Sequence, residues 1–293
     1  MHASRLALLA VLAIPLGATG PVAALAAEAC PPPQLALGRP HTDFVQWQAL
    51  NGRVLGPTNS LPGVRATALS YDAKGTRAVT VMFEFPPGWV MDRPHYLNSD
   101  QEMFVLSGEI EFDGTVYGPG DYGYIPAGFA HHLLRSPKGA TVLNFYEGEH
   151  LAFYAAAPAG MYQPRRLIHR IRSAKLAWRH ARDGSEFKRL RRDRGNGEET
   201  WLLRVPAQSP GTDGMRAAPR LHAAVEEFFL VEGEVSTPQG TMKSGAYAWR
   251  APGTPVGPAF SRSGYVALLR SKGGAPGGRS ADGIRELPLD PPY

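Results

Sequence analysis

The chain has one cysteine, Cys30, among its 293 residues, so it cannot form an intrachain disulfide. An exported protein of this sequence must therefore be held together by packing alone. The chain also lacks an apolar run long enough for a membrane-spanning helix. It contains no phosphate-binding loop, no zinc-finger spacing and no nucleophile elbow. These absences argue against P-loop nucleotide hydrolases, zinc-finger proteins and α/β-hydrolases.

Helix-breaking residues are abundant, with 33 glycines and 27 prolines. This composition favours short strands joined by tight turns over a helical protein. The length suits one large domain or two ordinary ones. The net charge of +5 suits anionic ligands but does not require nucleic acid. Residues 165–194 hold twelve Lys or Arg against three acidic residues, which we interpret as a solvated basic face and not as a nucleic-acid or membrane surface.

The N-terminus resembles a secretory signal peptide. Arg5 precedes the apolar run Leu6–Ile14, which is too short to span a membrane. Small residues follow, and both Ala24–Ala26 and Ala27–Ala29 fit a cleavage site. We expect a periplasmic or secreted protein whose mature chain begins between Ala27 and Cys30. The alternative is an apolar N-terminal helix that is retained.

The sequence repeats itself. Residues Glu102–Ile110 resemble Glu227–Val235 at a constant offset of 125. The same offset relates four further pairs of residues, namely Gly120 and Gly245, Tyr122 and Tyr247, Tyr124 and Trp249, and Gly128 and Gly253. A constant offset over separate segments indicates two structural units of similar fold.

Each unit reads as a series of strands and turns, with a hairpin signal at Asp113–Gly114. Short strands at this spacing predict an all-β sandwich or barrel. We expect a signal peptide at 1–29, a first barrel with an N-terminal arm at 30–154, a linker at 155–164, and a second barrel with a C-terminal tail at 165–293.

The repeated segments resemble the two signature motifs of the cupin superfamily, which read Gly-x5-His-x-His-x3or4-Glu-x6-Gly and Gly-x5-Pro-x-Gly-x2-His-x3-Asn. The strings around Glu102–Gly108 and Gly120–Gly128 are similar to those of bacterial bicupins of the RmlC-like group that have no assigned reaction. The resemblance implies two tandem jelly-roll barrels. It also implies that a divalent metal can be held by three His and one Glu, because alternate residues of a strand face one side.

The first unit keeps His95 and His131 at the first and last ligand positions. Leu97 replaces the second His, and Gln101 occupies the Glu position. The resemblance therefore implies a metal site of His95, Gln101 and His131, with Glu102 as the alternative third ligand. On a regular strand Gln101 and Glu102 cannot both point inward. The alternative is a pocket that uses both imidazoles without a metal.

The second unit keeps the two middle positions, His222 and Glu226, as a weaker metal site. Arg220 stands at the first His position and Val256 at the last. Arg220 could pair with Glu226 or receive an anionic ligand. Three aromatic residues could line a ligand pocket or simply pack in a core, namely Tyr122, Tyr124 and Trp249.

Two functions follow from these patterns. The first is an exported bicupin that binds a small polar or anionic molecule, with or without a divalent metal in the first barrel. The second is a metal-dependent cupin enzyme of the dioxygenase, isomerase or hydrolase type. We expect a small-molecule ligand, no nucleic acid and no transmembrane span, and a homo-oligomer stays open.

Overall fold

The computed structural model describes residues 38–181, 184–207, 220–221, 224–257, 259–273 and 285–286. The predicted signal peptide, Cys30 and His222 lie outside these residues. The described part of the chain consists of β-strands and three short 3-10 helices. No helix in it is long and apolar enough to cross a membrane.

The strands fall into two series. The first series contains β1 (Thr42–Gln46), β2 (Arg53–Val54), β3 (Arg65–Tyr71), β4 (Val79–Phe85), β5 (Trp89–Met91), β6 (Tyr96–Leu97), β7 (Gln101–Gly108), β8 (Ile110–Phe112), β9 (Thr115–Tyr117), β10 (Asp121–Ile125), β11 (Leu134–Ser136), β12 (Ala140–Tyr146) and β13 (Ala152–Phe153). The second contains β14 (Ile168–Arg172), β15 (Arg179–His180), β16 (Glu186–Arg192), β17 (Glu199–Val205), β18 (Arg220–Leu221), β19 (Val225–Thr237), β20 (Gly240–Lys243), β21 (Ala246–Arg250), β22 (Pro255–Val256), β23 (Tyr265–Lys272) and β24 (Arg285–Glu286). The 3-10 helices are η1 (Trp47–Ala49), η2 (Pro164–Arg166) and η3 (Ser173–Lys175).

The two series build sheets of the same order. One large sheet runs β14-β10-β7-β12-β4-β3-β2, and the other runs β1-β21-β19-β23-β17-β16-β15 with β20 attached to β19. A smaller sheet, β5-β11-β8-β9, packs on the first large sheet to complete barrel 1. The second large sheet and the β22-β18-β24 sheet belong to barrel 2. The prediction of two tandem cupin barrels is confirmed.

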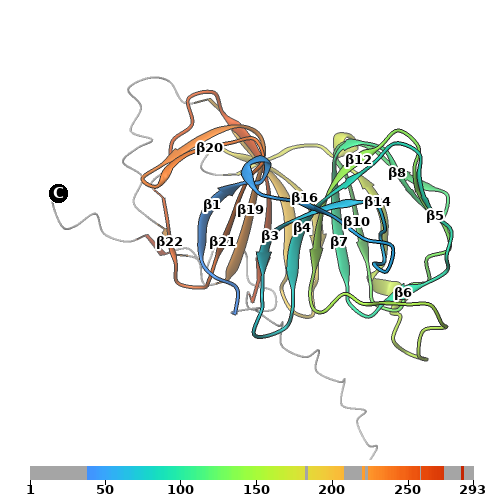
Figure 1. Ribbon diagram of the computed structural model, residues 1–293. Helices are drawn as coiled ribbons and strands as arrows, with labels where there is room; N and C mark the ends of the chain where they lie inside the picture. Colours follow the sequence, from blue (N-terminus) through green and yellow to red (C-terminus); the bar gives the residue numbers. More distant parts are fainter. Residues whose placement is uncertain are drawn as a thin grey trace, which may run out of the picture. The chain divides into compact units, whose positions relative to one another are not determined.

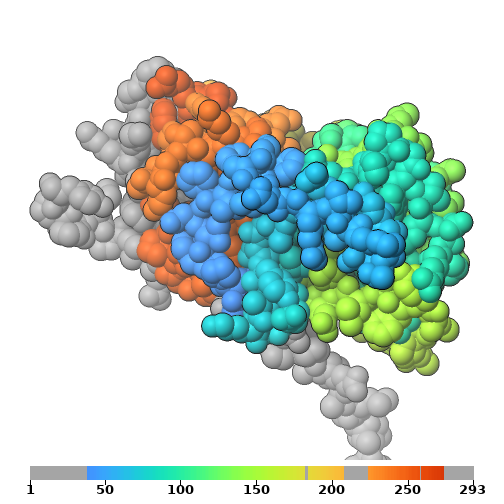
Figure 2. Space-filling view, in the orientation of Figure 1, coloured from blue at the N-terminus to red at the C-terminus, as the bar shows by residue number. Residues whose placement is uncertain are grey.

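The barrels exchange their first strands. β1 pairs with β21 of barrel 2, and β14 pairs with β10 of barrel 1. The exchange is symmetric, because β14 begins 126 residues after β1 and β21 begins 125 residues after β10. In Figure 1 the blue strand β1 lies beside β21, and in Figure 2 the blue N-terminal segment crosses from the orange barrel to the green one. Each large sheet therefore depends on a strand from the other half.

Three hydrophobic cores fill the structure. One lies inside barrel 1, one inside barrel 2, and one combines residues of both large sheets. Since side chains alternate along a strand, each strand of a large sheet sends one set of side chains into its own barrel and the next set toward the other barrel. This alternation decides which residues can reach a ligand.

The sequence repeat reflects repeated backbone constraints. Gly108 has a φ of 72°, and a Cβ there would lie 2.0 Å from the carbonyl oxygen of Gly139. Gly233 has a φ of 85°, and a Cβ there would lie 2.2 Å from the carbonyl oxygen of Gly264. Only glycine fits either position. The hairpin prediction is also confirmed, since Asp113–Gly114 joins β8 to β9.

Candidate functional site

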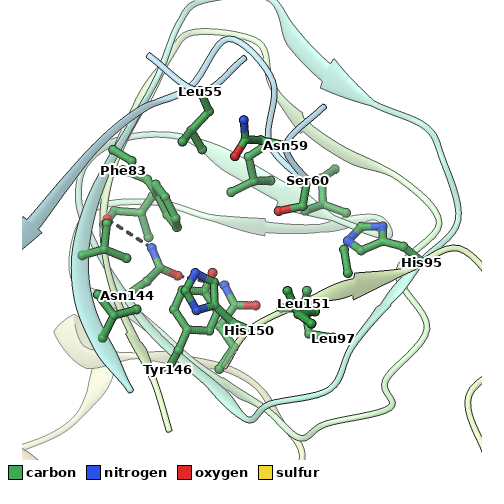
Figure 3. Close-up of a pocket in the computed structure, with 18 of the residues that line it drawn as sticks. Leu55, Asn59, Ser60, Phe83, His95, Leu97, Asn144, Tyr146, His150 and Leu151 are labelled. Atoms are coloured by element: carbon green, nitrogen blue, oxygen red, sulfur yellow. Dashed lines mark hydrogen bonds between the residues drawn. The ribbon is translucent and has the colours of Figure 1, made fainter. Parts of the chain in front are cut away.

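A cavity of about 510 Å³ lies inside barrel 1 (Figure 3). Most of its wall is apolar and comes from strands of both sheets, including Val81, Phe83, Phe85, Ile110, Phe112, Leu134 and Val142. Its lining includes Thr58, Asn59 and Ser60 from the loop between β2 and β3, and two further groups of polar side chains. The first contains His95 and His131, and the second contains Gln101, Asn144, Tyr146 and His150.

The backbone places His95 beside His131. The two residues form an isolated antiparallel bridge, in which each amide donates to the other's carbonyl at 3.0 and 2.8 Å. Their imidazole rings stack with centroids 5.3 Å apart and an interplanar angle of 27°. Nδ1 of His95 lies 3.0 Å from the carbonyl oxygen of Arg93. Because a carbonyl only accepts, Nδ1 carries the proton and Nε2 of His95 has a free lone pair.

Both imidazoles are neutral at physiological pH. Burial lowers the pKa of His131 to about 3, and neighbouring His95 contributes to the shift. Burial also lowers the pKa of His95. Nδ1 of His131 is buried and makes no hydrogen bond to any described residue. A buried polar atom without a partner is costly, so this nitrogen is available to a bound molecule or water.

The second polar group lies across the cavity. Figure 3 shows Asn144 and Tyr146 on the wall opposite His95. Nε2 of Gln101 donates to Oδ1 of Asn144 at 2.8 Å, so the Gln101 amide belongs to this side. The rings of Tyr146 and His150 stack with centroids 4.3 Å apart. Burial raises the pKa of Tyr146, and Nδ1 of His150 is buried without a partner among the described residues.

Sequence reasoning did not select Asn144, Tyr146 or His150. Val142, Asn144 and Tyr146 are alternate residues of β12 and therefore share its inward face. Asn144, within the largely apolar strand β12, was an available signal for itself and, by strand alternation, for Tyr146. His150 follows the strand in a connecting segment, and no sequence pattern marked it.

Glu102 faces away from the cavity, toward barrel 2. Its carboxylate accepts hydrogen bonds from the Tyr122 hydroxyl at 2.6 Å, from Nε of Arg270 at 2.7 Å and from the Thr200 hydroxyl. Burial alone would raise the pKa of Glu102, but Arg270 and Arg191 outweigh burial and lower the pKa to about 2. Glu102 therefore serves the contact between the barrels, and Gln101 lines the cavity.

The aromatic residues singled out from the sequence lie outside the cavity lining. Tyr122, Tyr124 and Trp249 belong to the core shared by the two large sheets. The Tyr124 hydroxyl donates to Oδ2 of Asp100 at 2.6 Å. The strand face that carries these rings points toward the other barrel, so their placement matches the core-packing alternative and not a pocket wall.

In barrel 2 the backbone of Arg220 pairs with that of Val256, just as His95 pairs with His131 in barrel 1. Glu226, the counterpart of Gln101, accepts a hydrogen bond from Nη1 of Arg250 at 2.6 Å. A guanidinium, that of Arg250, thus pairs with this carboxylate. The predicted pairing of Arg220 with Glu226 concerns a side chain outside the described part of the structure and stays a prediction.

The cavity residues do not match the full cupin metal set. No three His, Cys, Asp or Glu side chains among the described residues lie close enough together to hold a metal ion. The imidazoles of His95 and His131 lie together, while His150 stacks on Tyr146 in the other polar group and the amide of Gln101 is engaged there by Asn144. A third imidazole and an anionic carboxylate are missing from this donor set, and both favour binding of divalent metals.

Solved structures support the same fold. A protein of Nostoc punctiforme described as a candidate dioxygenase is 18% identical, with a TM-score of 0.72 over 86% of this chain and 92% of that one. Ylba of E. coli is 14% identical, with a TM-score of 0.53 over 80% of this chain and 92% of its own. Hazelnut vicilin (Corylus avellana) is 13% identical, with a TM-score of 0.51 over 84% and 88%. At such identities the likeness shows the fold alone.

A comparison with curated proteins found no match. The sequence matches the protein family described as "ChrR Cupin-like domain" twice, over residues 45–151 and over residues 168–273. The two matches coincide with the two barrels and cover most of the sequence. The chain therefore belongs to the ChrR cupin-like domain family, as a bicupin of the cupin superfamily.

Proposed function

We propose that this protein is an exported bicupin that binds a small organic molecule in the cavity of barrel 1. The observation that carries the proposal is the polar, unpartnered face of a formed cavity. The cavity is of ordinary ligand-site size and mostly apolar, and Nδ1 of His131 and Nδ1 of His150 lack partners among the described residues. Binding is favoured over metal-dependent turnover because, among the described residues, no third His, Asp or Glu lies beside His95 and His131 to complete a metal site.

A fluorescence titration tests this function. N-phenyl-1-naphthylamine is uncharged and becomes bright in apolar sites, so it should bind to the wild-type protein with saturation. Leu97 lines the cavity and is half-buried, so Leu97→Trp should fill the space and abolish the saturable signal. Val90 lies on the surface of barrel 1, 56% exposed, so Val90→Trp is the matched control and should bind as the wild type does. Equal binding by both variants would move the site elsewhere.

The second candidate function is a metal-dependent enzyme. The stacked pair of His95 and His131 favours it, since Nε2 of His95 has a free lone pair. Calorimetric titration with Mn²⁺ and Zn²⁺ decides between the two. Micromolar or tighter binding with one metal per chain, lost in His95→Ala and in His131→Ala, would support the enzyme. If both variants give the same heat of metal titration as the wild type, the result would support the metal-free binding protein.

Export rests on the segment before the barrels. Arg5, the apolar run Leu6–Ile14 and the small residues up to Ala29 support a cleaved signal peptide. Mass spectrometry of material from the periplasm or medium should find the N-terminus between Ala27 and Cys30. An intact Met1 in that material would overturn the proposal of cleavage.

A further inference from the structure

We infer that the ligand of barrel 1 is an uncharged aromatic molecule that carries a hydroxyl group. This inference rests on the proposed binding function and narrows it to one chemical class. Three properties of the cavity lead to it: the charge of its lining, its ring side chains, and its unused hydrogen-bonding atoms.

The lining holds charge only at exposed positions. Among the described lining residues the charged side chains are Arg53, Arg77 and Glu149, and all three are exposed. The buried polar residues are imidazoles, amides and a phenol. No Lys, Arg, Asp or Glu among the described lining residues is buried. A carboxylate, phosphate or ammonium inside the barrel would therefore lose its hydration without gaining a counter-charge.

Ring side chains form a substantial part of the interior surface, beside aliphatic ones. Phe83, Phe85 and Phe112 lie in the wall, together with the two stacked pairs His95–His131 and Tyr146–His150. Stacked and edge-on ring contacts stabilise a planar aromatic guest beyond the burial of its area. A saturated molecule of the same volume would gain the burial but not these contacts.

The unused polar atoms require both a donor and an acceptor. The lone pair on Nε2 of His95 accepts, so a ligand must bring a hydrogen-bond donor to it. The Tyr146 hydroxyl makes no hydrogen bond to another described residue and can donate. Because His95 and Tyr146 lie on opposite walls, one ligand hydroxyl meets one of them: it can donate to the imidazole or accept from the phenol. A carbonyl can only accept, which would leave the lone pair on Nε2 of His95 unused.

The entrance fits an apolar guest. Large apolar side chains are exposed at Tyr71, Leu151 and Tyr154, by 37%, 47% and 41%, and all three line the cavity. Exposed apolar side chains that continue the lining of a cavity offer apolar surface to a molecule as it leaves water.

Calorimetry with four probes of similar size tests the inference: 2-naphthol, 2-naphthoate, naphthalene and the saturated alcohol 2-decalol. At neutral pH, 2-naphthol should bind at least about tenfold more tightly than each of the others. His95→Leu should weaken 2-naphthol about five- to tenfold and leave naphthalene unchanged. His132 is exposed and does not line the cavity, so His132→Leu is the matched control and should change neither.

Any other order of affinity among the four probes would refute one feature of the inferred ligand. Tighter binding of 2-naphthoate would refute an uncharged ligand, and equal binding of 2-decalol would refute an aromatic one. Equal binding of naphthalene would refute the hydroxyl. If none of the four binds while N-phenyl-1-naphthylamine still binds, the inference fails and the binding function stands. If that dye also fails to bind, the proposed function itself fails.

Discussion

Arg270→Met should destabilise the folded protein more than any single surface change. Arg270 is 3% exposed and lies between the barrels, where its guanidinium binds Glu102 at 2.7 Å and Glu227 at 2.5 Å. It also binds Glu147. Removing one partner of a buried ion pair typically costs about 3–5 kcal/mol, because the remaining charge stays buried without compensation. Here one cation serves two fully buried carboxylates, of which Glu227 keeps Arg39 at 3.2 Å, so we expect a cost within that range.

The pKa of Glu102 gives a second measure of the same interaction. Its lowering from 4.5 to about 2 corresponds to about 3 kcal/mol of preference for the ionised form in the folded state. In the wild type this stability is present above the unfolded pKa and is lost as the pH falls from about 4.5 toward 2. Without Arg270 the folded pKa of Glu102 should rise above the unfolded value, so protonation would then favour folding. The stability gap between variant and wild type should therefore narrow in acid.

Guanidinium denaturation of Arg270→Met at several pH values measures both effects. Arg135→Met is the matched control, because Arg135 also binds a glutamate at 2.8 Å but is 47% exposed, and exposed pairs contribute about 0–1 kcal/mol. If Arg270→Met cost no more than Arg135→Met, or if the gap widened in acid, the buried network would not stabilise the contact between the barrels.

Two further predictions concern stability. Gly108→Ala should cost several times more than Gly63→Ala, because both have positive φ but only Gly108 has a carbonyl oxygen 2.0 Å from the new Cβ; similar melting temperatures for the two variants would contradict this. Folding of the wild type keeps His131 neutral, and the stability linked to this is present above about pH 6.5 and is lost as the pH falls toward the folded pKa of about 3. The variant His131→Phe should therefore lose less folding stability than the wild type between neutral pH and mild acid. Parallel pH profiles in denaturant titrations would show that His131 does not titrate in this way.

Much of the fold could be predicted because the repeated segments and the turn glycines can be recognised in the sequence itself, without knowledge of which strands pair. Strand alternation likewise separates Gln101 from Glu102, and motif spacing put Gln101 at the inward ligand position, where it lines the cavity. The exchange of β1 and β14 could not be predicted, since short edge strands carry no pattern that names their partner. Arg270 was not selected because its three carboxylate partners lie far away in the sequence.

The residues of the candidate site likewise divide into those that the sequence predicts and those that only the folded barrel brings together. His95 and His131 were recognisable because motif spacing ties them to a known fold. The polar wall opposite them depends on which face of β12 is turned inward, and this follows from packing of the whole barrel. The pairing of Glu226 with Arg250 likewise depends on the register between β19 and β21, in which these two residues lie directly opposite each other.

The central claim is that barrel 1 binds a small uncharged molecule between two polar groups. A crystal structure of the mature protein soaked with 2-naphthol tests it most directly. We predict electron density for one naphthol ring system inside barrel 1, with its hydroxyl within hydrogen-bonding distance of Nε2 of His95 or of the Tyr146 hydroxyl. Naphthol found only on the outer surface or inside barrel 2 would contradict the account.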